Sequence, residues 1–297
     1  MNRTLSYINF NRKIAAVVVL YYPGREVISK IDSYFNSIDR LYLIDNSDES
    51  DTCLYSLIKK SFFEKVSILS NHGNMGIAKA LNQAAEMALL DGFNWLLMMD
   101  QDSEFYPGSI LRLIRCLENY PDTAKIGIFA GNIEVQNAKN RLSSEGISSP
   151  LTVLTSGSIL NLSAYILAGP FLNEFFIDQV DHEYCLRLRT KKFSILRCNA
   201  ATLMHHLGNT DRHKFFGRLI NVSNHDHIRR YYMTRNRFEV CRRYFFIFPY
   251  YSFSLLWFSF VDLILIFLYE KEKKLKIRSV LLGLKDFLKG KFGRYSY

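Results

Sequence analysis

Two carboxylates two residues apart follow an apolar run in the chain. Asp100 and Asp102 come directly after Trp95–Met99, which reads as a buried strand. Oxygen ligands at this spacing can share one hard divalent cation, and such a cation can in turn bind a diphosphate. A lone Asp-x-Asp pair is more often a solvated turn, but the position after a buried strand favours a metal. The sequence predicts a site for Mg²⁺ or Mn²⁺ here.

A second acidic group contains Asp178, Asp181 and Glu183. Carboxylates near a helix start can stabilise the helix dipole, so capping is one interpretation. The other is a general base that takes a proton from an alcohol nucleophile. Glu183 and Arg187 are four residues apart and are expected to pair on one helix face.

Two further candidates are single residues at expected strand ends. Asp45 follows the apolar run 40–44 and could accept a hydrogen bond from a nucleobase or a ribose, although Asp45-Asn46-Ser47 is also turn-prone. His205, next to His206 and before a glycine turn, is either a third metal ligand or a structural histidine.

Arginines are dense in the segment 228–244, and four of them lie at positions 229, 230, 235 and 237. Guanidinium groups bind phosphates through paired hydrogen bonds, but an ordinary basic surface helix fits as well. The chain contains neither a GxGxxG nor a GxxxxGK[ST] pattern. Dinucleotide-binding and P-loop folds are therefore disfavoured.

Strands and helices alternate in the first half of the chain. Strands are expected over 14–22, 40–44, 66–69 and 95–99, and helices over 27–37, 77–90 and from Pro107 to 119. This order indicates a mostly parallel α/β sheet, whose ligands bind at the carboxyl ends of its strands. Further strands are expected over 126–130, 152–160 and 194–198, and helices over 183–189 and 228–244.

Composition limits the class of protein. The 297 residues are 48% hydrophobic and 22% charged, which is typical of a globular chain. Five scattered cysteines without a CxxC pair argue against a disulfide framework and against a zinc ribbon. Residues 1–13 hold no apolar run, so no secretory signal is expected, and a reduced cytosolic setting follows.

The positive charge is concentrated at the C-terminal end. Residues 212–297 hold 18 Lys/Arg and 6 Asp/Glu, a net charge of +12, whereas the whole chain has +10. A nucleic acid, an anionic membrane surface or a phosphorylated substrate could each explain this excess. Nucleic-acid binding leaves the four aspartates at 45, 100, 102 and 181 without a role, so it is disfavoured.

An aromatic stretch begins at Phe245 and runs without a charge to Val261, and Asp262 interrupts it. A spanning helix needs ~20 apolar residues. Pro249, Asp262 and basic residues on both sides favour helices lying in the membrane interface, while a single membrane span and a soluble core helix remain the alternatives. We therefore expect a catalytic domain over 1–244 and a membrane-association segment over 245–297.

Five motifs occur in an order that resembles the inverting family-two glycosyltransferases of GT-A fold, over roughly residues 14–245. They are Tyr21-Tyr22-Pro23, Leu43-Ile44-Asp45-Asn46-Ser47, N-M-G-I-A-K-A-L-N over 74–82, Met99-Asp100-Gln101-Asp102-Ser103 and F-I-D-Q-V-D-H-E over 176–183. The third, fourth and fifth motifs, with Arg230-Tyr231-Tyr232 and Arg235-Asn236, are similar to the bacterial rhamnosyltransferase branch. Tyr22-Pro23 departs from the commoner Tyr-Asn.

The resemblance implies a role for each matching position. Asp45 would contact the nucleobase, Asp102 would bind the metal with Asp100 on the diphosphate, and Asp181 would be the catalytic base. His205 would join the metal. The other implied donor-binding residues are Tyr22, Asn74, Gly76, Lys79, Arg230 and Arg235. Asp178 and Glu183 would lie on the acceptor side.

The activity that the resemblance implies is transfer of L-rhamnose from dTDP-L-rhamnose, with inversion. The acceptor would be a hydroxyl of a lipid-linked or growing cell-surface polysaccharide such as O-antigen, at the cytoplasmic face of the inner membrane. A nucleotidyltransferase, or another metal-dependent nucleotide-sugar enzyme, remains the alternative. Such enzymes usually carry a phosphate loop rich in glycine and lysine near the start, which residues 21–25 do not provide.

Overall fold

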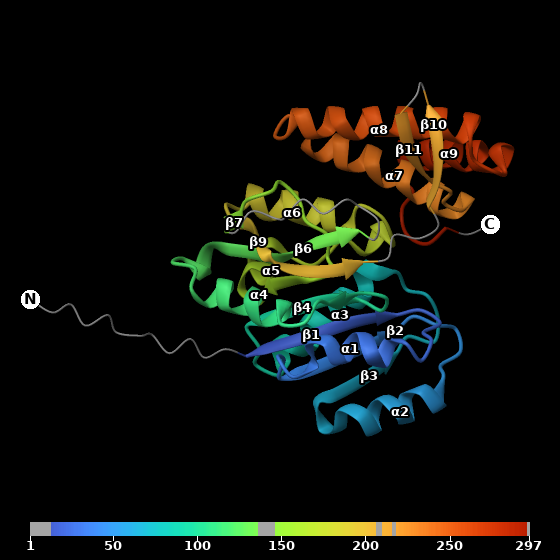
Figure 1. Cartoon of the computed structure of the whole chain (residues 1–297). Helices are drawn as coiled ribbons and strands as arrows, with labels where there is room; N and C mark the ends of the chain where they lie inside the picture. The colour runs from blue at the N-terminus through green and yellow to red at the C-terminus, as the bar shows by residue number, and fades with distance from the viewer. Residues whose placement is uncertain (1–12, 136–145, 206–209, 216–217, 296–297) are drawn as a thin grey trace, which may run out of the picture.

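A computed structural model describes residues 13–135, 146–205, 210–215 and 218–295 (Figure 1). Its centre is a nine-stranded sheet with the order β3-β2-β1-β4-β8-β6-β9-β5, in which β7 also pairs with β9. The strands are β1 (Ile14–Leu20), β2 (Arg40–Asp45), β3 (Val66–Ser70), β4 (Trp95–Asp100), β5 (Glu104–Phe105), β6 (Ile126–Val135), β7 (Ile147–Ser148), β8 (Ser158–Asn161) and β9 (Ser194–His205). The strands β3, β2, β1 and β4 are parallel, whereas β8 runs antiparallel between β4 and β6. The predicted mixed, mostly parallel α/β fold is confirmed.

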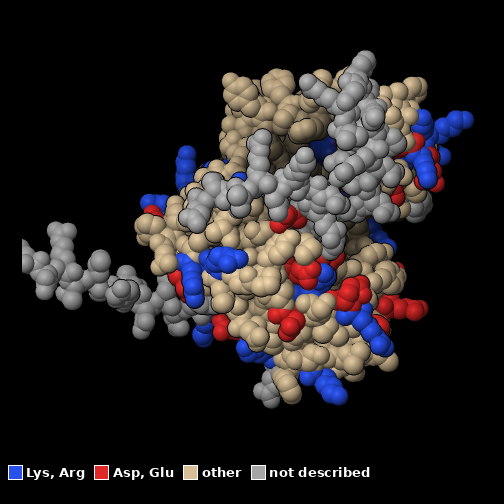
Figure 2. Space-filling model, viewed as in Figure 1, with Lys and Arg blue, Asp and Glu red and all other residues tan. Residues whose placement is uncertain are grey.

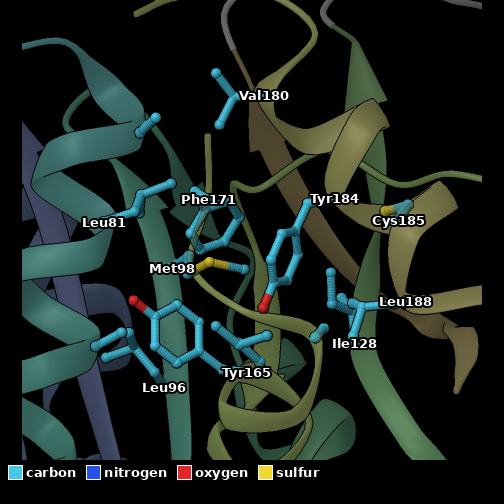
Figure 3. Close-up of a cluster of buried hydrophobic side chains, with 14 of the residues drawn as sticks. Leu81, Leu96, Met98, Ile128, Tyr165, Phe171, Val180, Tyr184, Cys185 and Leu188 are labelled. Carbon is cyan, nitrogen blue, oxygen red and sulfur yellow. The ribbon is translucent and has the colours of Figure 1, made fainter. Parts of the chain in front are cut away.

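Helices cover both faces of the sheet, because successive strand residues point to opposite sides. In β1, Ala15 and Val17 pack with the Ala-rich face of α3, while Ala16 and Val18 pack on the opposite face with α1 and α4. Figure 3 shows the first of these two cores, in which Phe171 stacks on Tyr184. The helices are α1 (Val27–Phe35), α2 (Thr52–Phe62), α3 (Ile77–Leu90), α4 (Ser109–Glu118), α5 (Leu162–Ala168) and α6 (Val180–Thr190), with short 3₁₀ turns at Phe63–Lys65, Thr123–Lys125 and Asn173–Phe175.

Three predicted boundaries are wrong for local reasons. The strand expected over 152–160 begins only at Ser158, because Gly157 has φ +74° and closes a turn before it. The helix expected from Pro107 begins at Ser109, because Gly108 before it is left-handed. The strand expected over 194–198 continues to His205 beside β6.

The C-terminal third forms a separate helical layer with α7 (His227–Tyr244), α8 (Pro249–Leu268) and α9 (Lys273–Leu288), preceded by the hairpin of β10 (Thr210–Phe215) and β11 (Arg218–Ser223). Figure 1 shows α7 between the α/β layers and α8. Because α7 packs on α8 and α9, the helical layer begins before residue 245, and the expected domain boundary at 244/245 stays a prediction. Among the described residues, α8 alone is long and apolar enough to cross a membrane, with a mean hydropathy of 2.0.

Candidate active site

Asp45 ends β2 and is fully buried. Its Oδ1 accepts a hydrogen bond from the Ser47 backbone N–H at 2.8 Å, and its Oδ2 accepts one from the Tyr55 hydroxyl. Burial, helped by this bond to Asp45, raises the pKa of Tyr55 to about 12. The structure therefore gives Asp45 a turn-stabilising role, and its contact with a nucleobase stays a prediction.

Tyr22 lies just beyond the end of β1 and is 56% exposed. Its backbone N–H donates to Ser47 Oγ at 2.7 Å, and its hydroxyl donates to Asp48 Oδ2 at 2.8 Å. The hydrogen bond to Asp48 raises the pKa of Tyr22. The side chain of Gln101, which follows β4, bonds both the N–H and the C=O of Tyr21. The ends of β1, β2 and β4 are thus joined at one edge of the sheet.

The segment before α3 shapes the same edge. Asn74 Oδ1 accepts the Gly76 N–H at 2.9 Å, and Gly76 has φ +84°. A Cβ at Gly76 would lie 2.7 Å from the Phe176 carbonyl oxygen, so only glycine allows this approach. Asn74 and Gly76 therefore dock α3 on the loop that leads to α6. Lys79, in the first turn of α3, is half-buried and has no ion-pair partner within the described ranges.

Asp100 and Asp102 lie where the sequence predicts them, at the carboxyl end of β4. Asp102 is exposed and Asp100 is half-buried, and the Asp100 N–H donates to Ser156 Oγ at 3.1 Å. The described part of the chain contains no cluster of three or more metal-ligating side chains. Mg²⁺ at phosphate sites is usually held by one or two carboxylates plus the substrate phosphates, and this pair fits that chemistry.

His205 is the last residue of β9, where its backbone pairs with Val135. Its side chain lies outside the described residues, and so do His206 and Gly208. The predicted metal contact of His205 therefore stays a prediction.

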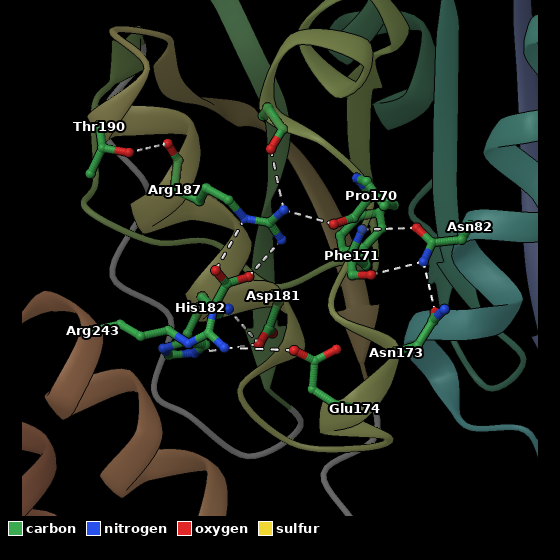
Figure 4. Close-up of polar contacts among 12 residues, drawn as sticks. Asn82, Pro170, Phe171, Asn173, Glu174, Asp181, His182, Arg187, Thr190 and Arg243 are labelled. Carbon is green, nitrogen blue, oxygen red and sulfur yellow. Dashed lines mark hydrogen bonds and ion pairs between the residues drawn. The ribbon is translucent and has the colours of Figure 1, made fainter. Parts of the chain in front are cut away.

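Asp181 lies in the first turn of α6, with 18% of its side chain exposed. Its Oδ1 accepts the His182 N–H at 2.8 Å, and the ring Nδ1 of His182 contacts the Tyr251 hydroxyl of α8. Figure 4 shows Asp181 and His182 at the start of α6.

The loop before α6 has an unusual backbone. Phe176, Asp178 and Gln179 have φ values of 64°, 64° and 62°, a conformation that costs free energy in residues other than glycine. The fully buried Asn236 holds this loop, because its Nδ2 lies 2.8 Å from the carbonyl oxygen of Phe175 and 2.7 Å from that of Ile177. It also lies 3.0 Å from the Asp178 carbonyl oxygen. A residue of α7 therefore positions the segment that carries Asp181.

The predicted phosphate contacts of Arg230 and Arg235 do not fit the structure. Arg230 is 2% exposed, and its guanidinium pairs with Asp262 at 3.1 Å and with Glu270. Arg235 is 1% exposed and donates to the backbone carbonyls of Glu174 and Gly293, among others. Both arginines hold the C-terminal layer in place, because their guanidinium groups contact carboxylates and backbone carbonyls within the fold.

The two predicted acceptor-side carboxylates, Glu183 and Asp178, also form ion pairs within the fold. Glu183 is 1% exposed, pairs with Arg187 at 2.7 Å and accepts the Tyr244 hydroxyl at 2.8 Å (Figure 4 shows the bonds to Arg187). Its predicted pairing with Arg187 is confirmed, whereas an acceptor contact does not fit. Asp178 pairs with Arg229 at 3.2 Å. Burial raises the pKa of Asp178, and the Arg229 guanidinium opposes that shift.

A cavity of about 240 Å³ lies beside the Asp181 segment. Its polar lining consists of Asn132, Thr152, His182 and Arg197. Arg197 Nε donates to Ser148 Oγ and Asn199 Oδ1, and no carboxylate of the described residues pairs with it. Gly131 also lines the cavity, and its backbone N–H donates to the Gly157 carbonyl oxygen. The residue before Gly157 is Ser156, whose hydroxyl accepts the Asp100 N–H.

The cavity therefore borders the start of α6 through His182, and the Gly131–Gly157 and Asp100–Ser156 hydrogen bonds connect its lining to the end of β4. Sequence reasoning missed Asn132, Thr152 and Arg197, because no motif surrounds them and only the fold brings them together.

Comparison with known proteins gives consistent results. A family model described as "Glycosyl transferase family 2" matches residues 25–173. A dTDP-rhamnosyl transferase, RfbF of Shigella flexneri, is 26% identical over 251 residues, which cover 78% of this chain and 81% of that protein.

Two solved structures share the fold at 11% identity. The crystal structure of GalNAc-T7 with UDP, GalNAc and Mn²⁺ matches 82% of this chain and 50% of that chain, with a TM-score of 0.61. The crystal structure of TarS from S. aureus matches 93% of this chain and 49% of that chain, with a TM-score of 0.57. The chain thus spans about half the length of each. The expected GT-A fold is confirmed.

Proposed function

Because the chain belongs to glycosyl transferase family 2, we propose that it transfers L-rhamnose from dTDP-L-rhamnose, with inversion, to a hydroxyl of a lipid-linked or growing cell-surface polysaccharide. The observation that supports this proposal is that Asp102 lies at the carboxyl end of β4 while His182, the neighbour of Asp181 in the first turn of α6, lines the polar cavity. The likeness to a dTDP-rhamnosyl transferase supports the choice of donor.

In the proposed reaction Asp181 acts as the general base. The acceptor hydroxyl lies in the cavity, and Asp181 takes its proton as the oxygen attacks the anomeric carbon of the donor. The bond from that carbon to the diphosphate oxygen breaks, and the nucleoside diphosphate leaves with the electron pair. Attack from the face opposite to the leaving group inverts the anomeric centre in one displacement.

Asp100 and Asp102 would hold a divalent cation, Mg²⁺ or Mn²⁺, at the end of β4. When bound, the cation would neutralise the negative charge that develops on the leaving diphosphate. Lys79, half-buried in the first turn of α3, would add a positive charge on the donor side.

The donor assignment is tested by calorimetric titration of the purified chain with nucleotide sugars in the presence of Mg²⁺. We expect dTDP-L-rhamnose to bind at least tenfold more tightly than UDP-glucose or GDP-mannose. Equal affinity for a uridine or guanosine donor would contradict the thymidine assignment while leaving the transferase proposal intact.

We also propose that the C-terminal layer attaches the enzyme to the cytoplasmic face of the inner membrane. Large apolar side chains of this layer face solvent, including Phe246 at 94%, Tyr250 at 91% and Phe267 at 67% exposure. In the upper part of Figure 2, the surface that is not grey is mostly uncharged, and Lys and Arg gather at its right edge together with some Asp and Glu. A large apolar patch with a basic rim suits an anionic lipid surface.

The contacts of α8 favour a helix that lies in the membrane interface. Asp262, within α8, pairs with Arg230 and Arg237 of α7. α7 in turn holds the Asp181 loop through Asn236. A spanning α8 would draw the arginines of α7 into hydrocarbon, which is costly. An interfacial position leaves these ion pairs intact.

For the membrane surface we predict that vesicles containing phosphatidylglycerol sediment the chain at low salt, and that high salt weakens this binding without abolishing it. Replacing exposed aromatic side chains in the double variant Phe253→Ser/Trp257→Ser should weaken binding at least tenfold, since each buried aromatic contributes about 1.5–3 kcal/mol. The control is Phe63→Ser, which removes an aromatic that is 77% exposed on the α/β domain. A wild-type chain that stays in the supernatant would overturn the membrane proposal.

For the loop before α6 we predict that Asn236→Ala lowers kcat about 10- to 100-fold, because a small misplacement of Asp181 is costly. Donor affinity should change little. Thr234→Ala is a matched control, since the one hydrogen bond of that buried hydroxyl to a described residue goes to the Arg230 carbonyl of its own helix, at 2.9 Å. Steady-state kinetics and circular dichroism check the result, and a folded Asn236→Ala variant with the wild-type kcat would contradict the positioning role.

A further inference from the structure

A groove of about 260 Å³ lies between α7, α8 and α9, away from the active site described above. Most of its lining is apolar and comes from all three helices, including Met233, Phe238, Phe260, Leu263, Ile277 and Leu281. Phe260 is 53% exposed and Leu281 is 62% exposed. The groove therefore opens on the same apolar surface that we assign to the membrane.

One wall of the groove is charged, with Arg230, Arg237 and Asp262. These side chains belong to a series of connected ion pairs that extends into the C-terminal helical layer. Arg237 pairs with Asp262 at 2.5 Å, and Asp262 pairs with Arg230 at 3.1 Å. Arg230 pairs with Glu270, which pairs with Lys276 at 2.8 Å. Three cations thus share two carboxylates, and the five side chains together have a net charge of +1.

Within this group of ion pairs, the positive charge is least compensated at Arg237. Glu270 lies between Arg230 and Lys276, and both of these cations are 2% exposed. Arg237 pairs only with Asp262, a carboxylate that it shares with Arg230, and its buried Nε has no hydrogen-bond partner among the described residues. The Arg237 side chain is 15% exposed, so its charge is partly shielded from water and is not fully compensated by the shared carboxylate. A guanidinium binds phosphate oxygens through directional hydrogen bonds.

We propose that this groove binds one anionic phospholipid of the bilayer. Its hydrocarbon chain would lie between Phe260, Leu263 and Leu281, and its phosphate would bind Arg237. The arrangement fits an interfacial α8, because Arg237 belongs to α7, which lies on the side of the catalytic domain (Figure 1). The exposed side chains of Phe260 and Leu281, in α8 and α9, line the apolar part of the groove. The inference rests on the proposed membrane attachment and not on the transferase chemistry.

Native mass spectrometry of the full chain in a nonionic detergent tests this site, with phosphatidylglycerol and phosphatidylcholine of identical acyl chains as probes. We expect one phosphatidylglycerol per chain, bound at least tenfold more tightly than phosphatidylcholine. Arg237→Gln should abolish this preference, and Arg237→Lys should retain part of it. Ser259→Trp, which fills the groove from α8, should remove binding of both lipids. Thermal unfolding checks that each variant is folded.

Trp257→Ser is the matched control, because Trp257 is exposed on α8 and does not line the groove. It should keep the bound lipid although vesicle binding weakens. Equal affinity for the two lipids, or a folded Ser259→Trp variant that keeps its phosphatidylglycerol, would overturn the lipid site. A wild-type chain that sediments with vesicles but retains no lipid would overturn the groove proposal alone, whereas loss of vesicle binding would overturn the attachment itself.

Discussion

Asp181→Asn is expected to lower kcat by about 10²–10⁴-fold, because the amide keeps the shape of the carboxylate but cannot accept the acceptor proton. Donor affinity should stay within about threefold of wild type, since the proposed base acts on the acceptor. Steady-state kinetics with calorimetric donor binding measures both quantities. Asp181 is 18% exposed and caps only its neighbour His182, so the fold should survive the change.

The matched control for Asp181→Asn is Glu174→Gln, which neutralises a 41% exposed carboxylate at the start of the same loop. Its ion pair with Arg243 is long, at 3.6 Å, and it should leave kcat nearly unchanged. An Asp181→Asn variant that loses donor affinity but keeps kcat would assign Asp181 to the donor instead.

Asp102→Ala should abolish turnover together with metal-dependent donor binding. The side chain is exposed at the end of β4, so its loss costs the fold little, and the leaving diphosphate would lose its main charge neutralisation. Donor titrations with and without Mg²⁺ give the expected signature, in which the variant binds the donor weakly in both conditions. Excess EDTA should likewise abolish wild-type activity.

Glu49→Gln serves as the control for Asp102→Ala, because Glu49 is an exposed carboxylate in the loop after β2, at the same sheet edge. It should retain both activity and the response to Mg²⁺. Full wild-type activity in excess EDTA would contradict the metal role of Asp102.

The α/β half of the fold was largely predictable, because its strands are uninterrupted apolar runs and its helix 77–90 has clear periodicity. The positions of Asp100 and Asp102 at a strand end, and of Asp181 near a helix start, were also predictable. The ends of these elements can be recognised from the local sequence pattern. Local patterns also predicted the Glu183–Arg187 pair, since four residues make one helical turn.

The roles of Arg230, Arg235 and Asn236 were not predictable from local pattern. A dense run of arginines suggests phosphate contacts, but the partners of Arg230 and Arg235 are Glu270, Asp262 and backbone carbonyls far away in the sequence. The fold alone reveals that α7 is an internal helix between two layers. The polar cavity lining at Asn132, Thr152 and Arg197 likewise comes from three separate segments.

In the proposed reaction, Asp181 and the Asp100–Asp102 pair support a single displacement on a nucleotide sugar. The most direct test is the anomeric configuration of the product, measured by NMR after transfer from dTDP-L-rhamnose to a saccharide acceptor in the presence of Mg²⁺. We expect an anomeric configuration opposite to that of the donor. A product with the same configuration as the donor would require a second displacement or a front-face reaction, and it would contradict the role of Asp181 as a general base in a one-step transfer.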